Sequence, residues 1–124
     1  MDKILIADDT PSIRITLKEG LSAYFPKFEI EAFESGEGLV KRLGEDLTGV
    51  RIALIDNDMR PGITGSEIIK RYSRLVKFPF VLDYGGDEEI DKKAMQNGAF
   101  GYLIKPASIV KVKDMINRAL EIRS

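Results

Sequence analysis

The sequence predicts an α/β fold in which one open, parallel β-sheet is covered by helices on both faces. Five short runs rich in apolar residues alternate with longer stretches that have helical periodicity. Most of these runs are followed by Gly, Pro, Asp or Ser, and four are almost continuously apolar, which is typical of parallel strands buried on both faces. Right-handed crossovers between such strands place helices on both sides of the sheet.

The expected strands are short, and one of them differs from the rest. We place them at residues 4–7, 28–33, 52–55, 80–82 and 100–104. The second alternates apolar and acidic residues in Phe28, Glu29, Ile30 and Glu31, which favours an edge strand with one wetter face. The chain of 124 residues has the usual length of one compact domain, so we expect residues 1–124 to form a single unit.

The expected helices are recognised by apolar side chains three or four residues apart. The first helix should begin at Pro11, because proline is tolerated in the first turn, with Asp9 or Thr10 as its N-cap. The fourth helix, at about residues 88–97, has fewer apolar positions and should end at Gly98. The apolar positions of the helices, in chain order, are Ile13, Leu17, Leu21 and Tyr24; Leu39, Val40, Leu43 and Leu47; Ile68, Ile69, Tyr72, Leu75 and Val76; Ile90, Ala94 and Met95; and Val112, Met115, Ile116, Ala119 and Leu120.

The composition excludes several kinds of chemistry. Hydrophobic residues make up 44% of the chain and charged residues 31%, which favours a globular fold, and the net charge of −1 does not indicate a nucleic-acid or membrane partner. Without any cysteine or histidine, the chain cannot form disulfides, Ser-His-Asp triads or His- or Cys-ligated zinc sites. No apolar stretch approaches the roughly 20 residues that span a bilayer, and the N-terminus does not resemble a secretory signal, so we expect a cytoplasmic location.

Charged residues gather where the expected strands end. In open α/β sheets ligands bind at the carboxyl ends of the strands. Neighbouring carboxylates repel one another, and a bound cation normally offsets that cost. An all-oxygen set favours Mg²⁺, Mn²⁺ or Ca²⁺, and a small site with room for water fits Mg²⁺ best. The residues that follow the strands are Asp8 and Asp9 after the first, Asp56 and Asp58 after the third, Asp83 and Tyr84 after the fourth, and Lys105 after the fifth.

Such a set of residues is sufficient for phosphoryl transfer. A carboxylate shielded by a metal ion can attack a phosphorus atom and form an acyl phosphate. A nearby lysine then stabilises charge on the phosphoryl oxygens. The sequence therefore predicts a metal-dependent phosphoryl-acceptor site at this edge of the sheet.

The order of these motifs resembles the receiver domain of two-component response regulators over essentially the whole chain. The resemblance rests on the acidic pair in ILIADD, the aspartate that ends IALID, the Pro and Gly residues of RPGITG, the segment NGAFGYLIKP and a closing helix. Together these motifs are specific, whereas each alone is weak. The resemblance implies a flavodoxin-like, doubly wound (βα)5 fold with a five-stranded parallel sheet in the order 2-1-3-4-5.

The resemblance also implies roles for individual residues. Asp56 would be the phosphoacceptor, and Lys105 would contact the phosphoryl group. Asp8 and Asp9 would be the metal-binding acids, completed by Asp56 and by Asp58, whose position supplies a backbone carbonyl ligand in the family. Pro106 would follow a cis peptide bond. Tyr102 matches the aromatic residue that reorients on activation, and with Tyr84 it is our candidate for the switch.

The function implied by the resemblance is signalling. A sensor histidine kinase or phosphotransfer protein would donate the phosphoryl group to Asp56 in the presence of Mg²⁺, and the modified domain would present an altered last-helix face to a downstream effector protein or domain. In this interpretation the chain is no enzyme beyond its own phosphorylation and dephosphorylation, and it makes no direct contact with nucleic acid or membrane.

Two departures from the family pattern leave questions open. The family places a proline four residues after the acceptor, but Asp56 and Pro61 are five apart, so holding the proline fixed would put Asn57 at the acceptor position. We prefer Asp56, because an extra residue is better tolerated in a loop than inside a buried strand. At the end of the fourth strand the family has Ser or Thr, whereas this chain has either Asp83 or Tyr84, depending on the direction of counting.

Two alternative functions remain open. The first is a pseudo-receiver, which keeps the fold and binds other proteins without being phosphorylated; the missing Ser or Thr favours it. The second is a haloacid-dehalogenase-type phosphatase, since Asp56, Asn57 and Asp58 form a DxD pattern after an apolar strand. Against the phosphatase, that family needs the motif on its first strand, has Thr or Val where this chain has Arg60, and usually has a longer chain.

Overall fold

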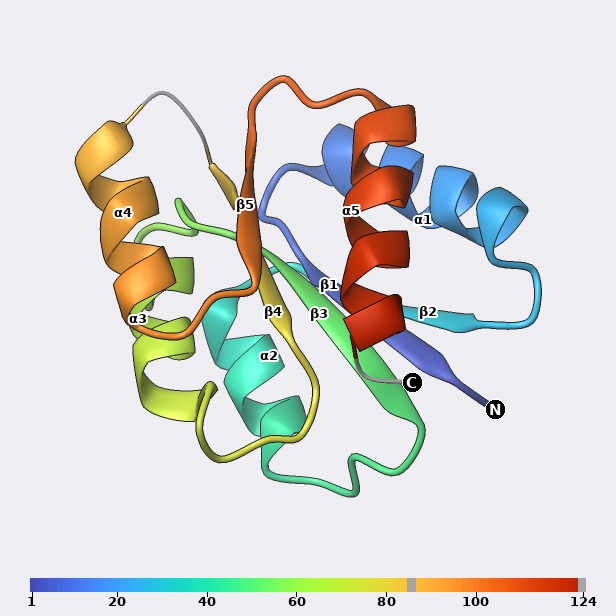
Figure 1. The fold of residues 1–124 in the computed structure, drawn as a ribbon, viewed down its shortest axis with the longest axis horizontal. Coiled ribbons are helices and arrows are strands. Elements are labelled where there is room, and N and C mark those ends of the chain that lie inside the picture. The colour runs from blue at the N-terminus through green and yellow to red at the C-terminus, as the bar shows by residue number, and fades with distance from the viewer. Residues whose placement is uncertain (85–86, 123–124) are drawn as a thin grey trace.

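The computed structural model describes residues 1–84 and 87–122, and for Tyr84 and Ile122 it describes the backbone alone. Its centre is a sheet of five parallel strands in the order β2-β1-β3-β4-β5 (Figure 1). This order and the edge position of the second strand confirm the predictions. The strands are β1 (Lys3–Ala7), β2 (Glu29–Phe33), β3 (Val50–Asp56), β4 (Phe80–Tyr84) and β5 (Gly101–Ile104).

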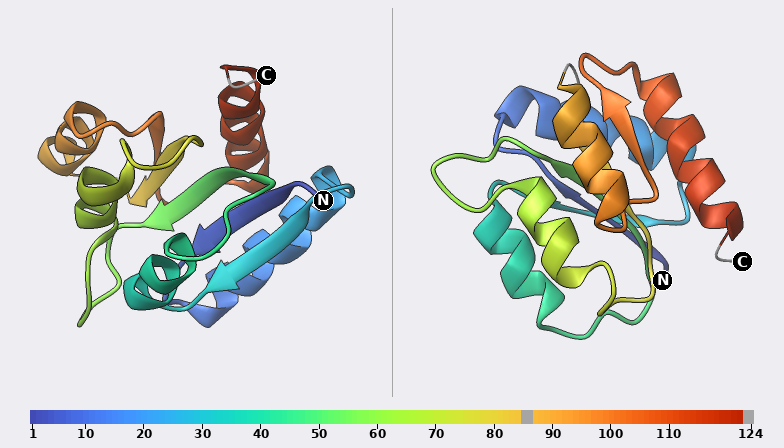
Figure 2. Two further views of the ribbon diagram at one scale, coloured as in Figure 1. Left: turned by 90° about the horizontal axis from the view of Figure 1, so that it is seen from below. Right: turned by 60° about the vertical axis from the view of Figure 1, so that its left-hand side comes forward.

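Five helices cover the two faces of the sheet, as expected for a doubly wound fold. Helices α1 and α5 pack on one face, and α2, α3 and α4 pack on the other (Figures 1 and 2). The helices are α1 (Pro11–Tyr24), α2 (Gly36–Leu43), α3 (Gly65–Tyr72), α4 (Glu88–Gln96) and α5 (Ile109–Ile122). No helix in the described ranges is both long and apolar enough to cross a membrane.

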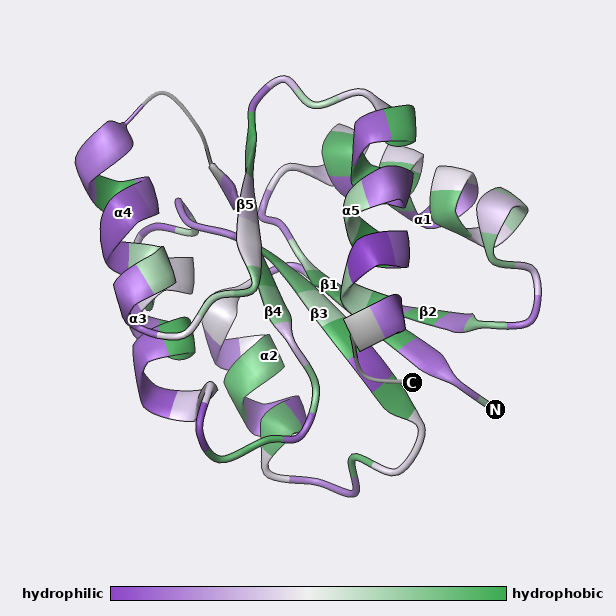
Figure 3. Cartoon of the chain, in the orientation of Figure 1, coloured by the Kyte–Doolittle hydropathy of each residue, from purple (hydrophilic) through white to green (hydrophobic). Residues whose placement is uncertain are grey.

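The sheet separates two apolar clusters, because successive side chains of a strand point to opposite faces. In β1, Ile4 and Ile6 pack with the α1 and α5 residues, whereas Leu5 packs with those of α2, α3 and α4. All three are fully buried. Figure 3 shows the same division, with hydrophobic strands at the centre and helices that are hydrophobic on one side only. Burial on both faces explains why these strand segments are almost continuously apolar.

Several positions at the ends of the expected helices proved wrong. Helix α3 ends at Tyr72, so Leu75 lies in the turn that follows and is 75% exposed. Helix α2 ends at Leu43, and Leu47 packs against the core from the loop beyond it. Tyr24 is largely exposed at the end of α1, where the ammonium group of Lys113 lies 5.2 Å from the centre of its ring. Apolar spacing identifies a helical face but does not identify where the backbone leaves the helix.

The start of α1 brings the first acidic residues into position. Pro11 occupies the first turn and Thr10 is the N-cap, but the Thr10 side chain makes no capping hydrogen bond. Instead, the backbone N–H of Thr10 donates to Oδ1 of Asp8 at 2.9 Å. Arg14, one turn further on, donates to the backbone carbonyl of Asp8 at 2.8 Å. These two bonds hold the turn between β1 and α1, and the bond from Thr10 also orients the Asp8 side chain.

Candidate functional site

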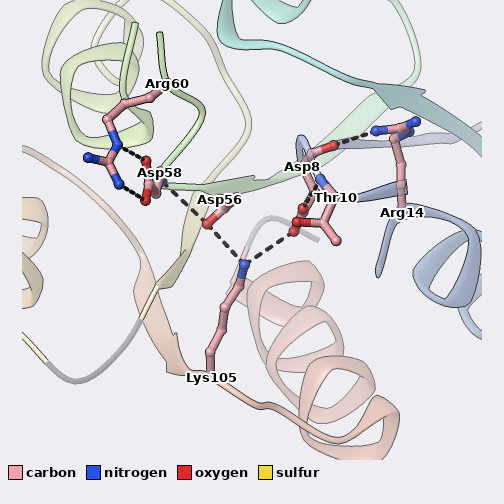
Figure 4. A network of polar contacts seen from close by, with 7 residues as sticks. All are labelled: Asp8, Thr10, Arg14, Asp56, Asp58, Arg60 and Lys105. Atoms are coloured by element: carbon pink, nitrogen blue, oxygen red, sulfur yellow. Dashed lines mark hydrogen bonds and ion pairs between the residues drawn. The ribbon is translucent and has the colours of Figure 1, made fainter. Parts of the chain in front are cut away.

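The charged residues predicted at the strand ends meet at the carboxyl edge of the sheet (Figure 4). Asp8 directly follows β1, Asp56 is the last residue of β3, and Lys105 directly follows β5. Strands β1 and β3 are neighbours whose register aligns Ala7 with Ile55, so Asp8 and Asp56 come out of the sheet side by side. Asp8, Asp56 and Lys105 lie two residues beyond Ile6, Leu54 and Leu103, respectively, whose buried side chains pack with the α1 and α5 residues. Because side chains two apart in a strand share a face, the three charged side chains lie on the same side of the sheet.

Lys105 connects the two aspartates. Its Nζ atom lies 3.1 Å from Oδ1 of Asp56 and 3.4 Å from Oδ2 of Asp8. Both carboxylates are almost fully buried, with Asp8 at 1% and Asp56 at 3% exposure. Lys105 itself remains partly accessible, so its ammonium group reaches the buried acids from the solvent side.

Burial and charge act against each other in this cluster. Burial raises the pKa of Asp56, and the nearby Asp8 charge adds to that effect, while the hydrogen bond and charge of Lys105 oppose it. Burial lowers the pKa of Lys105, but the hydrogen bond to Asp56 and the charges of Asp56, Asp8 and Asp83 outweigh it, so the net pKa is raised. One lysine therefore faces an excess of buried negative charge, and an additional cation would be stabilising here.

The carboxylates of Asp8, Asp9 and Asp56 can hold a metal ion. One oxygen from each lies within 4.8 Å of the others, with Asp9 exposed and the other two buried. This donor set contains only oxygen, which fits Mg²⁺ or Ca²⁺, and the exposed side at Asp9 leaves room for water ligands. The Asp58 carboxylate is engaged elsewhere, since Arg60 donates two hydrogen bonds to it at 2.7 and 2.9 Å.

The structure places Asp56, and not Asn57, in the cluster. Asn57 turns toward the start of α3, where its Oδ1 accepts hydrogen bonds from the backbone N–H and the hydroxyl of Ser66. The backbone N–H of Gly65 donates to the Asn57 carbonyl at 3.1 Å and closes the loop that contains the extra residue. A Cβ atom on Gly65 would lie 2.6 Å from the Asp56 carbonyl oxygen, so this close approach requires glycine.

Asp83 is a further member of the site; the sequence placed it after the fourth strand but gave it no role in metal or phosphoryl binding. It pairs in register with Asp56 on the neighbouring strand β4, so it is the residue beside the predicted acceptor. It is 4% exposed, and no described residue donates a hydrogen bond to its Oδ1 atom. Burial raises its pKa to about 6; Lys105 opposes the rise, and Asp56 and Asp8 add to it. In the sequence, Asp83 is the residue reached by counting back from Lys105 to the position where the family has Ser or Thr.

Of the two predicted switch residues, Tyr102 stands apart from the cluster. Tyr102 lies on β5 next to Leu103, whose side chain packs with the α1 and α5 residues, so Tyr102 faces the opposite side of the sheet and is 39% exposed. The side chain of Tyr84 lies outside the described residues. The peptide bond between Lys105 and Pro106 is cis, as expected, and a second cis bond, not expected, joins Arg60 to Pro61.

Comparisons with known proteins agree with this geometry. The model of the response regulator receiver domain family matches residues 4–117. The sporulation initiation phosphotransferase F of Bacillus subtilis is 30% identical over 127 residues, which cover 99% of this chain and 97% of that protein. The transcriptional activator protein ExaE of Pseudomonas putida is also 30% identical, over 119 residues, but the match covers 94% of this chain and only 54% of the activator.

A solved structure shows the same arrangement in three dimensions. A response regulator receiver domain protein from Clostridium thermocellum superimposes with a TM-score of 0.88 at 25% identity, covering 99% of this chain and 97% of that one. The shared strand order, the acids at the carboxyl edge and the family match over almost the whole chain lead to one conclusion. The chain belongs to the response regulator receiver domain family.

Proposed function

We propose that Asp56 accepts a phosphoryl group from a phosphohistidine of a sensor histidine kinase or phosphotransfer protein. The observation that carries this proposal is the pair of buried carboxylates, Asp8 and Asp56, joined by the Lys105 ammonium group at 3.4 and 3.1 Å. The 124 residues contain no histidine, so the donor imidazole has to lie outside them. Receiver domains are signalling domains, and the role proposed here is that of a phosphorylation-dependent signal receiver.

The residues of the site have distinct parts in this transfer. A carboxylate oxygen of Asp56 forms the new bond to phosphorus, and the bond from phosphorus to the donor nitrogen breaks, with its electron pair returning to the imidazole. Lys105 stabilises the negative charge on the phosphoryl oxygens from its position between Asp56 and Asp8. A Mg²⁺ ion held by Asp8, Asp9 and Asp56, with the backbone carbonyl of Asp58, would supply the remaining positive charge.

Signal output requires a surface that can change. The structure exposes large apolar side chains on α4, β5 and α5, at Met95, Tyr102, Ile104 and Val110. We propose that phosphorylation alters this face around the last helix, with Tyr102 and Tyr84 as the switch residues, and that an effector protein or domain binds there. The name of the related ExaE describes a transcriptional activator, and its greater length is consistent with an effector domain joined to a receiver.

Asp83 favours one competing interpretation. The buried Asp83 carboxylate pairs in register with Asp56 and adds negative charge beside the proposed acceptor, which opposes an incoming phosphoryl group. A pseudo-receiver that signals only by protein contact is therefore the second candidate. The phosphatase alternative has no comparable support, because Asp56 ends the third strand of a chain that matches the receiver family.

Incubation with Mg²⁺ and acetyl phosphate tests the proposal. Intact-protein mass spectrometry should show the gain of one phosphoryl group that requires Mg²⁺ and is absent in Asp56→Asn. Asp114→Asn provides a matched control, because this carboxylate is exposed on α5 and forms an ion pair with Lys113. It should be modified like the wild type. Absence of any gain in the wild type, with the fold intact, would favour the pseudo-receiver instead.

A further inference from the structure

A pocket of about 470 Å³ lies beside the acidic cluster, between α1, the loop that follows β5 and the start of α5. This volume falls within the range of roughly 300–1,000 Å³ that small-molecule sites in proteins have. Most of its lining is apolar and comes from both helices and the connecting loop: Ile13, Leu17, Pro106, Ala107, Ile109 and Val112. Such a surface suits a compact apolar group.

The polar residues of the pocket are few and unevenly charged. Asp83 and Lys105 are the charged residues among its described lining residues, and the hydroxyls of Ser12 and Thr16 complete the polar set. The Lys105 ammonium group is directed at Asp56 and Asp8, at 3.1 and 3.4 Å, and no described ion pair within 4.0 Å joins it to Asp83. The charge of Lys105 is thus already compensated by other acids.

Asp83 is the unusual member of this lining. Its side chain is 4% exposed, and its Oδ1 atom has no hydrogen-bond donor among the described residues. A buried carboxylate oxygen without a donor costs free energy that a cationic donor in the pocket would recover.

We propose that this pocket binds a small primary amine with an apolar body, whose ammonium group pairs with the Asp83 carboxylate. The apolar group would lie against the α1 and α5 side chains. The ammonium group has three donors, and the Ser12 and Thr16 hydroxyls are available acceptors at the same pocket. An anionic ligand would be repelled by Asp83, and a neutral one of equal shape would leave the carboxylate uncompensated.

This binding does not require phosphorylation of Asp56. Lys105 and Asp83 line the pocket and also adjoin the acidic cluster, but Asp8, Asp9 and Asp56 do not line the pocket. A failure of the acetyl phosphate experiment therefore has no bearing on amine binding, and a failure to bind amine has none on phosphorylation. The two proposals are tested by separate measurements.

The test uses 2-phenylethylamine as the probe, with 2-phenylethanol and 3-phenylpropionate as its neutral and anionic counterparts. Each is titrated at pH 7.5 into the full chain labelled with ¹⁵N, and amide shifts give both the dissociation constant and the site. We expect the amine to shift amides of residues 12–17 and 107–112 and to bind at least about tenfold more tightly than the alcohol, since an added charged hydrogen bond contributes at least about that factor.

Two variants locate the charge that is responsible. Asp83→Asn keeps the shape of the side chain and should weaken amine binding about tenfold or more. Asp91→Asn is the matched control, because Asp91 is also a buried carboxylate with an unpartnered Oδ1 atom, but it lies on α4 away from the pocket. It should bind the amine like the wild type. Thr16→Phe, which fills the pocket from an exposed position on α1, should abolish binding.

Several results would overturn the proposal. These are equal affinity for the amine and the alcohol, undiminished binding by Asp83→Asn, and absence of binding to the wild type at millimolar probe. Amide shifts confined to the loops of Asp8, Asp9 and Asp56 would equally contradict it, because they would place the amine in the acidic cluster. The comparison of amine with alcohol uses only the wild-type chain, so it remains decisive even if a variant fails to fold.

Discussion

Replacing Asp83 by asparagine should stabilise the protein at neutral pH but not in acid. Burial raises the pKa of this carboxyl from 3.8 to about 6. At about 1.36 kcal/mol for each pH unit, this rise corresponds to a cost of about 3 kcal/mol for the ionised side chain in the folded state. No described residue donates to the Oδ1 atom at this position, so burying the new amide without a partner costs about 1 kcal/mol or more. We therefore expect a net gain of about 1–2 kcal/mol at pH 7.5.

The pH dependence follows from the sign of the same shift. Below 3.8 the wild-type carboxyl is protonated in both states and has no charge to bury. Between pH 3.8 and about 6 the folded state binds more protons than the unfolded state, so wild-type stability falls as pH rises. Above about pH 6 the full cost is present. The cost is thus absent at pH 3.5 and complete at pH 7.5.

Urea denaturation in EDTA at pH 3.5 and 7.5 measures this difference. Asp83→Asn should raise the midpoint at pH 7.5 with an unchanged slope, and lose that advantage over the wild type at pH 3.5. The exposed Asp114→Asn should remain within about 0.5 kcal/mol of the wild type at pH 7.5. A destabilised Asp83→Asn at pH 7.5, or an equal gain at both pH values, would refute the conclusion that ionised Asp83 costs folding free energy.

Three further predictions concern the close packing of the sheet and the acidic cluster. Gly65→Ala should lower the free energy of unfolding in urea by about 1–3 kcal/mol, because its Cβ would lie 2.6 Å from the Asp56 carbonyl oxygen. In Gly44→Ala the nearest atom would lie at 3.5 Å, so the free energy should change by no more than about 0.5 kcal/mol. Equal effects of the two substitutions would contradict this prediction. Leu82→Ala should cost about 2–5 kcal/mol, since this side chain is fully buried, and a smaller loss would mean that the core collapses around the cavity. Mg²⁺ at ten times its dissociation constant should raise the free energy of unfolding by about 1.4 kcal/mol. Asp9→Asn should reduce that gain at the same Mg²⁺ concentration. If Mg²⁺ shifts the melting temperature of Asp9→Asn as much as that of the wild type, Asp9 is not a metal ligand.

Strands were easier to predict from the sequence than helix ends, for a physical reason. A strand buried on both faces has to be apolar at nearly every position, so the segment of β3 at residues 52–55 is visible in the sequence itself. A helix end depends on where the backbone hydrogen bonds stop, and apolar residues continue past that point. Leu75 has the spacing of a core residue but lies in a turn with most of its surface exposed.

The position of each site residue along its strand was also predictable. Asp8, Asp56 and Lys105 follow three apolar segments that have to end at the same edge of a parallel sheet. Their common side of the sheet follows from the two-residue period, since each lies two residues beyond a side chain of the α1 and α5 cluster. Local pattern and strand direction were sufficient for this much of the site.

The sequence by itself therefore determined the α/β class, the parallel strands, the edge position of β2 and the gathering of acids around one lysine, because each depends on local periodicity. Only the tertiary structure decided which neighbouring side chains enter the cluster. Asn57 accepts hydrogen bonds from Ser66 in the first turn of α3, Arg60 engages the Asp58 carboxylate, and Asp83 lies beside Asp56 with no donor to its Oδ1 atom among the described residues. These outcomes depend on partners distant in the chain, as with Lys105 and Asp8, 97 residues apart, and on burial that no local pattern specifies.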